Sequence, residues 1–367
     1  MKIGIPKEIL DQEYRVAITP AGVYALTAQG HKVYIEDNAG LESGISNEAF
    51  KDAGAFIVRT PHDVFEEGDL ILKVKQPLQE EFKYLKLKHI LFTFLHLAAD
   101  KNLAMNLCKS GATCIAYETI ELPNGVLPLL VPMSEIAGRL SPQIGAHFLE
   151  KQYGGMGVLL AGVPGVEPAN VVIIGGGTVG INSAKMTIGL GANVFILDKN
   201  LGRLRELDDY FHGRLQTVYS TQHKIIDVVM KADLIIAAVL IAGARAPKLI
   251  TRELIKKMRQ GSVIVDVAID QGGCIEDVKA TKHSDPVYKV DGVSIYAVPN
   301  IPGAVPMTST VALTNATLPY VLKLANNGYK AVLDDPALAK GVNIRNGSIV
   351  HKVVADALNM EYTPLSV

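Results

Sequence analysis

The stretch VVIIGGGTVGINSAKMTIGLGANVFILD, from Val171 to Asp198, places a glycine-rich turn between two apolar runs and ends on an aspartate. Gly175, Gly177 and Gly180 fit the pattern G-x-G-x-x-G, with a predicted strand before them and a predicted helix after them. In such a turn the first glycine bends the chain tightly and the second lets a pyrophosphate approach the backbone. The third lets the helix pack closely on the strand, and the helix N-terminus offers free N–H groups to an anion. The stretch therefore predicts a dinucleotide-binding site.

Asp198 narrows the choice of ligand. It ends the second apolar run, about twenty residues after the glycine turn, where the dinucleotide fingerprint has an acidic residue. A carboxylate there accepts hydrogen bonds from ribose hydroxyls and repels a 2′-phosphate, which favours NAD over NADP. Methyltransferases also use an acid at a strand end, so another nucleoside ligand stays open on this pattern alone.

Short apolar runs alternate with helix-patterned segments along most of the chain, which predicts the α/β class with doubly wound parallel sheets. The candidate strands are KIGIP, KVYIE, LILKV, HILFTFL, CIAYE, VVIIG, NVFIL, LQTVY, LIIAAV and SVIVDV.

The chain has 367 residues, which exceeds the usual size of a single hydrophobic core, and one short segment of its sequence is weakly repeated. The segment 69–74, DLILKV, resembles 233–238, DLIIAA, and each is followed by a helical segment and another apolar strand. We therefore expect two Rossmann-like domains that flank a cleft and are linked by long helices. Residues 1–130 with 306–367 would form a discontinuous substrate domain, and 131–305 the NAD-binding domain.

Two linking segments carry more specific expectations. Ser134, followed by Glu135, is typical of a helix N-cap, and Ala137, Ser141 and Gly145 form a stripe of small residues. The stripe fits a close helix contact either within one subunit or between subunits. The tail after residue 306 predicts a helix interrupted near Pro319 and again at 327–328, and we expect it to pack on the N-terminal domain.

Composition excludes several classes of function. The formal net charge is −1 and no basic tract is present, which argues against nucleic acid. The N-terminus, MKIGIPKEIL, does not resemble a signal peptide. The longest apolar run, at 234–244, is too short for a membrane span and predicts a buried strand and its loop. The three cysteines lack metal-site spacing and suggest reduced thiols, so we expect a cytoplasmic protein with no membrane partner.

Four residues could bind an amino-acid substrate or catalyse its reaction. Arg15 could bind a carboxylate through two hydrogen bonds, although a lone arginine beside an apolar strand start (VAI) is more often a surface charge. Lys75 follows an apolar strand, where lysines of open sheets project into the ligand crevice, and Lys73 would be its solvated neighbour. His96 ends the run ILFTFL and is either an acid/base catalyst or a hydrogen-bonded core histidine. Asp270 ends VIVDVAID and is either functional or a cap for the next turn.

Six blocks together resemble one known family, that of L-alanine dehydrogenase. They are PKEILDQEYRVAITP, DLILKVKQP, LFTFLHLAAD, IIGGGTVG, VDVAIDQGG and TSTVALTNATLPY, and they span nearly the whole chain. The resemblance implies reversible, NAD-dependent oxidative deamination of L-alanine to pyruvate and ammonium. It implies Arg15 and Lys75 as substrate-binding residues and His96 and Asp270 as the catalytic pair. If the two sheets face each other, the internal repeat places His96 and Asp270 at the ends of corresponding strands on opposite walls of one cleft.

The same resemblance implies the cofactor contacts and a homo-oligomer, a hexamer. The implied cofactor residues are Ser134, Gly175, Gly177, Thr178, Val179, Gly180, Asp198, Arg203, Ser220, Val239, Leu240, Val267, Ala268, Ile269, Asp270, Lys279, Val298, Pro299, Asn300 and Ile301. Arg203 stands where the family often has lysine, which keeps a cation near the adenosine. Some members bind a metal through a glutamate and a histidine; Glu118 is present here, but no histidine lies near Asn327, so we expect no metal.

Two other functions remain open. The soluble dinucleotide-binding part of the proton-translocating transhydrogenase shares the RVA-x-TP and ILKV blocks but lacks the histidine and the aspartate. A catalytically silent NAD sensor is the other alternative, and the presence of all four substrate residues argues against it.

Overall fold

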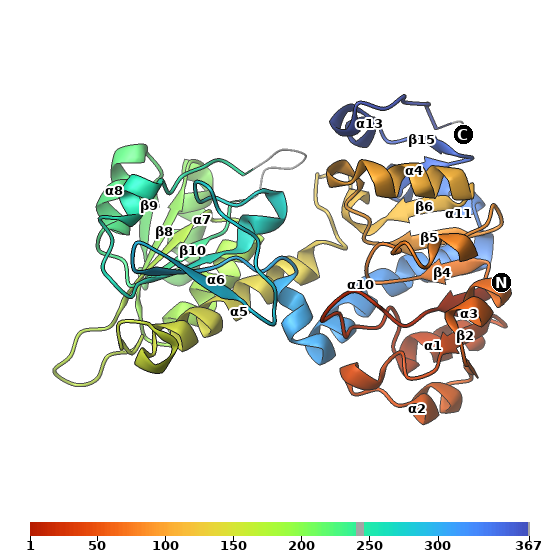
Figure 1. Cartoon of the computed structure of the whole chain (residues 1–367), viewed down its shortest axis with the longest axis horizontal. Coiled ribbons are helices and arrows are strands. Elements are labelled where there is room, and N and C mark those ends of the chain that lie inside the picture. Colours follow the sequence, from red (N-terminus) through yellow and green to blue (C-terminus); the bar gives the residue numbers. More distant parts are fainter. Residues whose placement is uncertain (240–245, 366–367) are drawn as a thin grey trace. The chain divides into compact units, whose positions relative to one another are not determined.

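The computed structural model describes residues 1–239 and 246–365 and divides into two compact units (Figure 1). Unit 1 consists of Met1–Met133 and Val305–Val367, and unit 2 of Ser134–Ala304. The chain leaves unit 1 within helix α5 (Val131–Leu149) and returns to it just before helix α10 (Pro306–Asn327). Both crossings therefore fall at long helices.

Unit 1 is built on an eight-stranded sheet in the order β15-β14-β6-β5-β4-β1-β2-β3. Its strands are β1 (Lys2–Ile5), β2 (Lys32–Glu36), β3 (Phe56–Val58), β4 (Leu70–Leu72), β5 (Ile90–Thr93), β6 (Thr113–Ala116), β14 (Val342–Arg345) and β15 (Ser348–Ile349). Strands β1 to β6 pair in parallel, whereas β14 runs antiparallel to β6 and β15 antiparallel to β14.

Unit 2 is built on a seven-stranded sheet in the order β12-β13-β11-β10-β7-β8-β9. Its strands are β7 (Asn170–Ile174), β8 (Asn193–Asp198), β9 (Gln216–Tyr219), β10 (Leu234–Ala237), β11 (Val263–Asp266), β12 (Val287–Val290) and β13 (Val293–Tyr296). All neighbours pair in parallel except β12 with β13. The predicted α/β class is confirmed.

Both sheets follow the same doubly wound path. The chain runs outward from β1 through β2 to β3, then crosses to the other side of β1 and continues through β4, β5 and β6. In unit 2 it runs from β7 through β8 to β9 and continues from β10 through β11 to β13. Each sheet therefore has a topological switch point, between β1 and β4 and between β7 and β10, the place where ligands bind in such folds.

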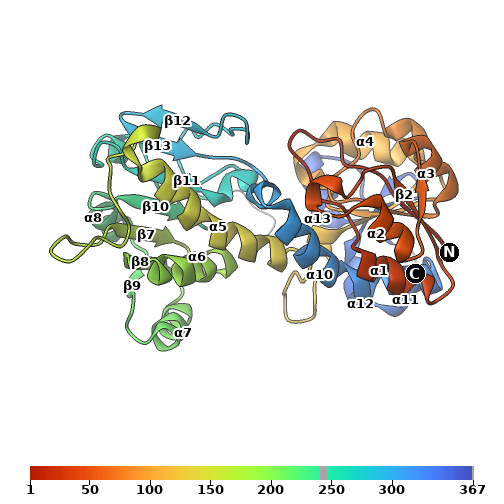
Figure 2. The same ribbon diagram turned by 90° about the horizontal axis from the view of Figure 1, so that it is seen from below.

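Helices cover the sheets within each unit (Figures 1 and 2). Unit 1 has α1 (Pro20–Thr27), α2 (Asn47–Asp52), α3 (Pro61–Glu67), α4 (Lys101–Ser110), α10, α11 (Lys330–Asp334), α12 (Pro336–Gly341) and α13 (Lys352–Leu358). Unit 2 has the larger part of α5 with α6 (Thr178–Gly189), α7 (Leu201–Phe211), α8 (Gln222–Val229) and α9 (Arg252–Ile255). Side chains cap many of these helices, as in the box where Thr60 and Asp63 satisfy each other's backbone N–H groups at the start of α3.

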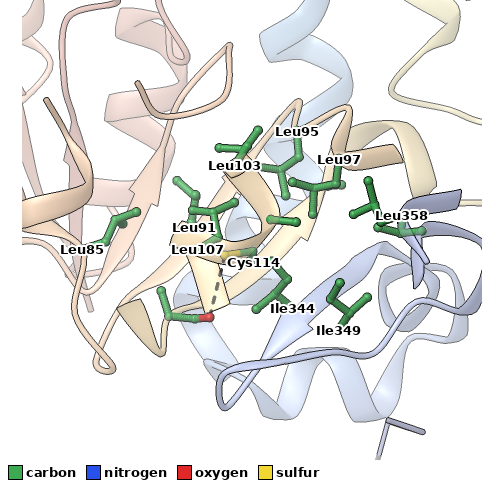
Figure 3. Packing of buried hydrophobic residues seen from close by; sticks show 14 of the residues in the cluster. Leu85, Leu91, Leu95, Leu97, Leu103, Leu107, Cys114, Ile344, Ile349 and Leu358 are labelled. Atoms are coloured by element: carbon green, nitrogen blue, oxygen red, sulfur yellow. Dashed lines mark hydrogen bonds between the residues drawn. The ribbon is translucent and has the colours of Figure 1, made fainter. Parts of the chain in front are cut away.

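All ten predicted strands are present, and the sequence analysis missed β3, β12, β13, β14 and β15. Strand β3 has three residues, too few to show a pattern, and β14 and β15 lie in the tail, where only helix was predicted. The tail adds these two strands to the sheet of unit 1. Figure 3 shows how Ile344, Ile349 and Leu358 of the tail pack with Leu91 and Leu107 in one buried cluster.

Helix α10 differs from the prediction, because it continues through Pro319 without interruption and ends at Asn327. Proline removes one hydrogen-bond donor from the helix, a cost that tertiary packing has to offset. One face of α10 is buried at helical spacing, at Leu313, Thr317, Val321 and Leu324, and this packing holds the helix together across the proline.

The small-residue stripe serves a contact inside unit 2, where α5 and α6 lie side by side (Figures 1 and 2). Next to the stripe, a Cβ at Gly138 would stand 2.4 Å from the carbonyl oxygen of Val179 in α6. The Ser141 and Ser183 hydroxyl oxygens lie 3.0 Å apart, and a Cβ at Gly145 would stand 2.4 Å from Leu234. The intramolecular alternative accounts for the stripe, which therefore lends no support to a contact between subunits.

Candidate functional site

The residues implicated in cofactor binding gather at one edge of the sheet in unit 2. Parallel strands end at the same edge of a sheet. Asp198 is the last residue of β8, and the segments 175–180, 220, 239, 267–270 and 298–301 follow the ends of β7, β9, β10, β11 and β13 in turn. Leu240 lies outside the described residues. Ser134 is not an N-cap as predicted, because α5 begins three residues earlier, at Val131, and places Ser134 in its first turn.

The three glycines of the turn differ in what surrounds them. Gly175 has φ +108°, and a Cβ there would lie 2.7 Å from the carbonyl oxygen of Ala238, across the switch point. A Cβ at Gly180 would lie 1.9 Å from the carbonyl oxygen of Gly175, so helix and turn touch without a side chain between them. Gly177, the residue before α6, is exposed, and a Cβ on it would meet nothing within 4 Å. The open space beside Gly177 and the uncapped N-terminus of α6 suit an anionic group.

Asp198 is tied to this turn. Its Oδ2 accepts a hydrogen bond of 2.8 Å from the backbone N–H of Gly176, and its Oδ1 accepts one of 2.8 Å from the N–H of Asn200. Arg203 closes the same corner: its Nε donates to the carbonyl oxygen of Gly176 at 2.7 Å, and its Nη1 lies 2.8 Å from Glu206. The cation expected near the adenosine is therefore present but already paired with a carboxylate.

The remaining expected cofactor residues divide by exposure. Ser220, Ala268, Ile269, Val298 and Ile301 are buried, whereas Val239, Val267, Pro299 and Asn300 are half-buried. Lys279 is exposed, and its backbone N–H donates to the Tyr288 hydroxyl at 3.0 Å. Asn300 has φ +66°, and its carbonyl oxygen accepts from Gly303 N at 2.8 Å, which turns the loop after β13.

The segment with Asp270 corrects the sequence analysis. Strand β11 ends at Asp266, and Asp270 lies in the following 3₁₀ turn, Val267–Gln271, with its side chain exposed. The buried carboxylate with a capping role is that of Asp266, which accepts from the N–H groups of Ala268 at 3.1 Å and Cys274 at 2.8 Å. Burial raises the pKa of Asp266 to about 6, and these hydrogen bonds oppose the rise. Asp266 thus fixes the loop that presents Asp270.

In unit 1, Arg15 is not a surface charge. Its residue is only 2% exposed, and its guanidinium makes two hydrogen bonds to Glu13, from Nε at 2.7 Å and from Nη2 at 2.5 Å. Its Nη1 contacts the sulfur of Met133 at 3.1 Å. The segment VAI that follows is a buried loop rather than a strand, and its Val16 N–H donates to the Thr310 hydroxyl.

His96 is not a core residue either. It lies three residues beyond β5, exposed, with φ +50° and its ring stacked on that of Phe94 at a centroid distance of 5.7 Å. The carboxylate of Glu118, just after β6, accepts from the N–H of His96 at 2.6 Å and from that of Leu95 at 3.2 Å. The left-handed conformation, which is uncommon outside glycine, is thereby held by a specific partner.

Lys75 is half-buried beyond the end of β4, and its neighbour Lys73 contradicts the expectation of a solvated side chain. Lys73 has no exposed surface, and its Nζ lies 3.1 Å from Glu8 Oε2 and 2.8 Å from Glu81 Oε1. Burial raises the pKa of Glu8, and the ammonium of Lys73 opposes the rise.

Sequence reasoning therefore missed the role of four acidic residues, whose carboxylates fix the segments or side chains of the site by hydrogen bonds. They are Glu8, Glu13, Glu118 and Asp266. Glu8, Glu118 and Asp266 stand at or just beyond the end of a buried strand, which is a recognisable position. What the sequence could not show is that their carboxylates face backbone N–H groups rather than a ligand.

Two searches of the described residues bear on metals and membranes. Residues 1–239 and 246–365 contain no group of three or more histidine, cysteine, aspartate or glutamate side chains placed to hold a metal ion. None of the helices in that same part of the chain has the length and apolar character that crossing a membrane requires.

Comparison with known proteins gives matches over the whole chain. Residues 4–137 match the family description "Alanine dehydrogenase/PNT, N-terminal domain" and residues 141–352 match "Alanine dehydrogenase/PNT, C-terminal domain". The chain is 56% identical to an alanine dehydrogenase of Methanococcus maripaludis, over 99% of this chain and 98% of the relative.

Solved structures agree with these matches. One described as an L-alanine dehydrogenase is 52% identical, with a TM-score of 0.95 over 98% of this chain and 99% of its own. A transhydrogenase from Sinorhizobium meliloti is 24% identical, with a TM-score of 0.83 over 95% of this chain and 100% of its own. At that identity the second likeness concerns the fold alone.

Proposed function

The chain belongs to the alanine dehydrogenase/PNT family, and on this basis we propose that it catalyses the reversible oxidative deamination of L-alanine to pyruvate and ammonium with NAD. The observation that carries the proposal is the match to an alanine dehydrogenase at 56% identity over nearly the full length of both chains. The geometry of each unit supports it further.

Unit 2 fits a dinucleotide. The space beside Gly177 and the N–H groups at the start of α6 suit a pyrophosphate, because backbone donors and the helix dipole both favour negative charge. Asp198 uses each oxygen for one backbone N–H, and a carboxylate has about four acceptor sites, so acceptor capacity remains for ribose hydroxyls.

The same corner favours NAD over NADP. A 2′-phosphate at the ribose would face the Asp198 carboxylate. Arg203, the cation that contacts the glycine turn, is already bound to Gly176 and to Glu206. The charge balance therefore disfavours a second phosphate.

Unit 1 supplies the groups for the substrate. Arg15 and Lys75 are cations that would bind the carboxylate of alanine or pyruvate, and Lys75 would also polarise the carbonyl. Glu13 fixes the guanidinium of Arg15 from one edge, so substrate would meet a preformed group.

The glycine turn and Asp198 would hold NAD, which would supply the acceptor for the α-hydride of alanine; loss of that hydride from the neutral amine gives the iminium ion of pyruvate. Water then adds to the iminium carbon and loses a proton, which gives a carbinolamine. Once its nitrogen is protonated, the C–N bond breaks, ammonia leaves, and the hydroxyl loses its proton to become the carbonyl of pyruvate. His96 would take the proton from water and deliver one to the leaving nitrogen, since a ring nitrogen of histidine can accept or donate a proton. Asp270 would orient the amine through its carboxylate.

The test is an absorbance assay of NADH formation with L-alanine, and of NADH consumption with pyruvate and ammonium, on the purified protein alone. The proposal expects turnover in both directions without a membrane partner. Binding of NADH with no alanine-dependent reaction would favour a subunit that only delivers NAD(H) or senses it, and would overturn the proposal.

A further inference from the structure

A fully buried lysine at the switch point of unit 1 is not explained by the proposed reaction. Lys73 comes directly after β4, and Glu8 comes shortly after β1, the neighbouring strand. The Lys73 Nζ lies 3.1 Å from Glu8 and 2.8 Å from Glu81, and the exposures of these three residues are 0%, 7% and 3%. Burying three charges is costly, and well-packed apolar residues would often serve stability as well or better. Their presence calls for a role other than stability.

The two carboxylates also bind the backbone on both sides of Lys75. Glu8 Oε1 accepts from the N–H of Val74 at 2.6 Å and from that of Lys75 at 3.3 Å. Glu81 Oε2 accepts from the N–H of Leu78 at 2.9 Å. The Thr93 hydroxyl of β5 donates to the carbonyl oxygen of Lys75 at 2.9 Å. The segment 74–78 is thus fixed at its beginning, at its end and at Lys75 itself.

We propose that Glu8, Lys73 and Glu81 form a positioning triad that sets the location of the Lys75 ammonium for the substrate. This inference rests on the proposed function. Lys73 joins the two carboxylates, and each carboxylate joins a different end of the segment, so the loss of one ion pair loosens the backbone that carries Lys75. The three residues act through Lys75 and have no contact with substrate of their own.

The first experiment compares Glu8→Gln with the unmodified full-length protein. Glutamine keeps the shape of the side chain but cannot both accept from the backbone and pair with Lys73 as a charge. Because the backbone that carries Lys75 loses a charged acceptor, kcat/KM for pyruvate should fall about tenfold or more. The dissociation constant of NADH, which binds through unit 2, should stay within about twofold.

Glu36→Gln is the matched control. Glu36 ends β2 at the same edge of the sheet and is partly buried, and its charge acts on Lys73 and Glu81. Its carboxylate accepts from the backbone N–H of Lys7 at 2.8 Å rather than from the Lys75 segment. Glu36→Gln removes one negative charge from the same edge of the sheet as Glu8→Gln does, and its kcat/KM for pyruvate should stay within about twofold of that of the unmodified protein.

The decisive measurement repeats Glu8→Gln in a Lys75→Ala background. If the triad acts through Lys75, Glu8→Gln causes no further loss of kcat/KM there, because interacting sites are non-additive. A loss of the same size in both backgrounds would overturn the inference, and so would no loss in either.

Folding and function are tested separately. Glu81→Gln loosens the other end of the segment and should reproduce the effect. If neither variant yields folded protein, the triad is a stability element and the inference falls. Absence of turnover in the unmodified protein would instead defeat the proposed function.

Discussion

The Asp198 carboxylate and the backbone N–H of Gly176 are joined by a hydrogen bond of 2.8 Å, although 22 positions separate the two residues in sequence. This bond brings the end of β8 against the glycine turn after β7, so the two features that first indicated a nucleotide site meet at one corner. A single substitution at Asp198 therefore acts on the turn and on the proposed ribose contact together.

Asp198→Ala should weaken NAD binding and narrow the preference over NADP. Loss of a charge-assisted hydrogen bond to a ribose hydroxyl costs about 1.5–3 kcal/mol, or roughly tenfold to a hundredfold in affinity. NADP should bind more tightly because its 2′-phosphate is no longer repelled by a carboxylate. The kcat/KM for NADP should therefore rise relative to that for NAD. Steady-state kinetics with both cofactors measure this ratio. Equal use of NAD and NADP by the unmodified protein would contradict the assignment of Asp198.

Gly177→Ala should separate ligand binding from stability. A Cβ at Gly177 meets no protein atom within 4 Å and the backbone φ is −70°, so the folded protein accommodates alanine. It would stand in the space proposed for the pyrophosphate, and the dissociation constant of NADH should rise tenfold or more while the melting temperature does not fall.

Gly189→Ala, at the C-terminal end of the helix that Gly177 precedes, is the control for Gly177→Ala. Its Cβ also has open space, so it should leave NADH binding unchanged and stabilise α6 slightly, by about 0.5–1 kcal/mol at most. NADH titration and thermal melts of both variants decide the matter. Unchanged NADH affinity in Gly177→Ala would place the dinucleotide elsewhere.

The sequence was sufficient to predict the sheets because their central strands are continuous apolar runs, such as Ile90–Thr93 and Val263–Asp266. It failed where order depends on distant partners. Strand β14 forms because β6 offers it an edge far away in the chain, and α10 survives Pro319 because one of its faces is buried. Neither cause has a local pattern.

The site shows the same division. The residues expected to touch ligands stand at strand ends, a position visible in sequence. Two charged residues differ from the prediction: Lys73 was expected in solvent and is buried, and the carboxylate that caps the turn after β11 is that of Asp266, the last residue of the strand, rather than that of Asp270. Only the fold shows which of two nearby charged residues faces the interior.

Glu118→Ala should slow turnover because it releases the backbone that presents His96. The N–H groups of Leu95 and His96 lose their acceptor, and the left-handed conformation of His96 loses its support. A catalytic group displaced by about 1 Å costs on the order of 10²-fold in rate, so kcat should fall by up to that factor. NADH binding should not change, since Glu118 lies in unit 1.

Glu121→Ala provides the comparison for Glu118→Ala. The Glu121 carboxylate pairs with Lys340 at 2.7 Å, with both side chains about half exposed, so its loss should change kcat by less than twofold. Adding Glu118→Ala to His96→Ala should cost nothing more. A further drop in that background would mean that Glu118 acts independently of His96.

Asp266 should make the protein less stable as the pH rises through slightly acidic values. Burial raises the pKa of Asp266 to about 6, above its ordinary value of 3.8, so the folded state holds a proton that the unfolded state has released. Between these two values the free energy of unfolding therefore decreases with rising pH, and above the higher value the dependence ends.

Asp266→Asn removes the titration, so the unmodified protein should lose about 1 kcal/mol relative to this variant from about pH 5 to about pH 6. Denaturant unfolding of both proteins across that range gives the difference at each pH. If the stability difference between the two proteins instead stayed constant over the same range, the hydrogen bonds from Ala268 and Cys274 would outweigh burial, and Asp266 would be ionised throughout.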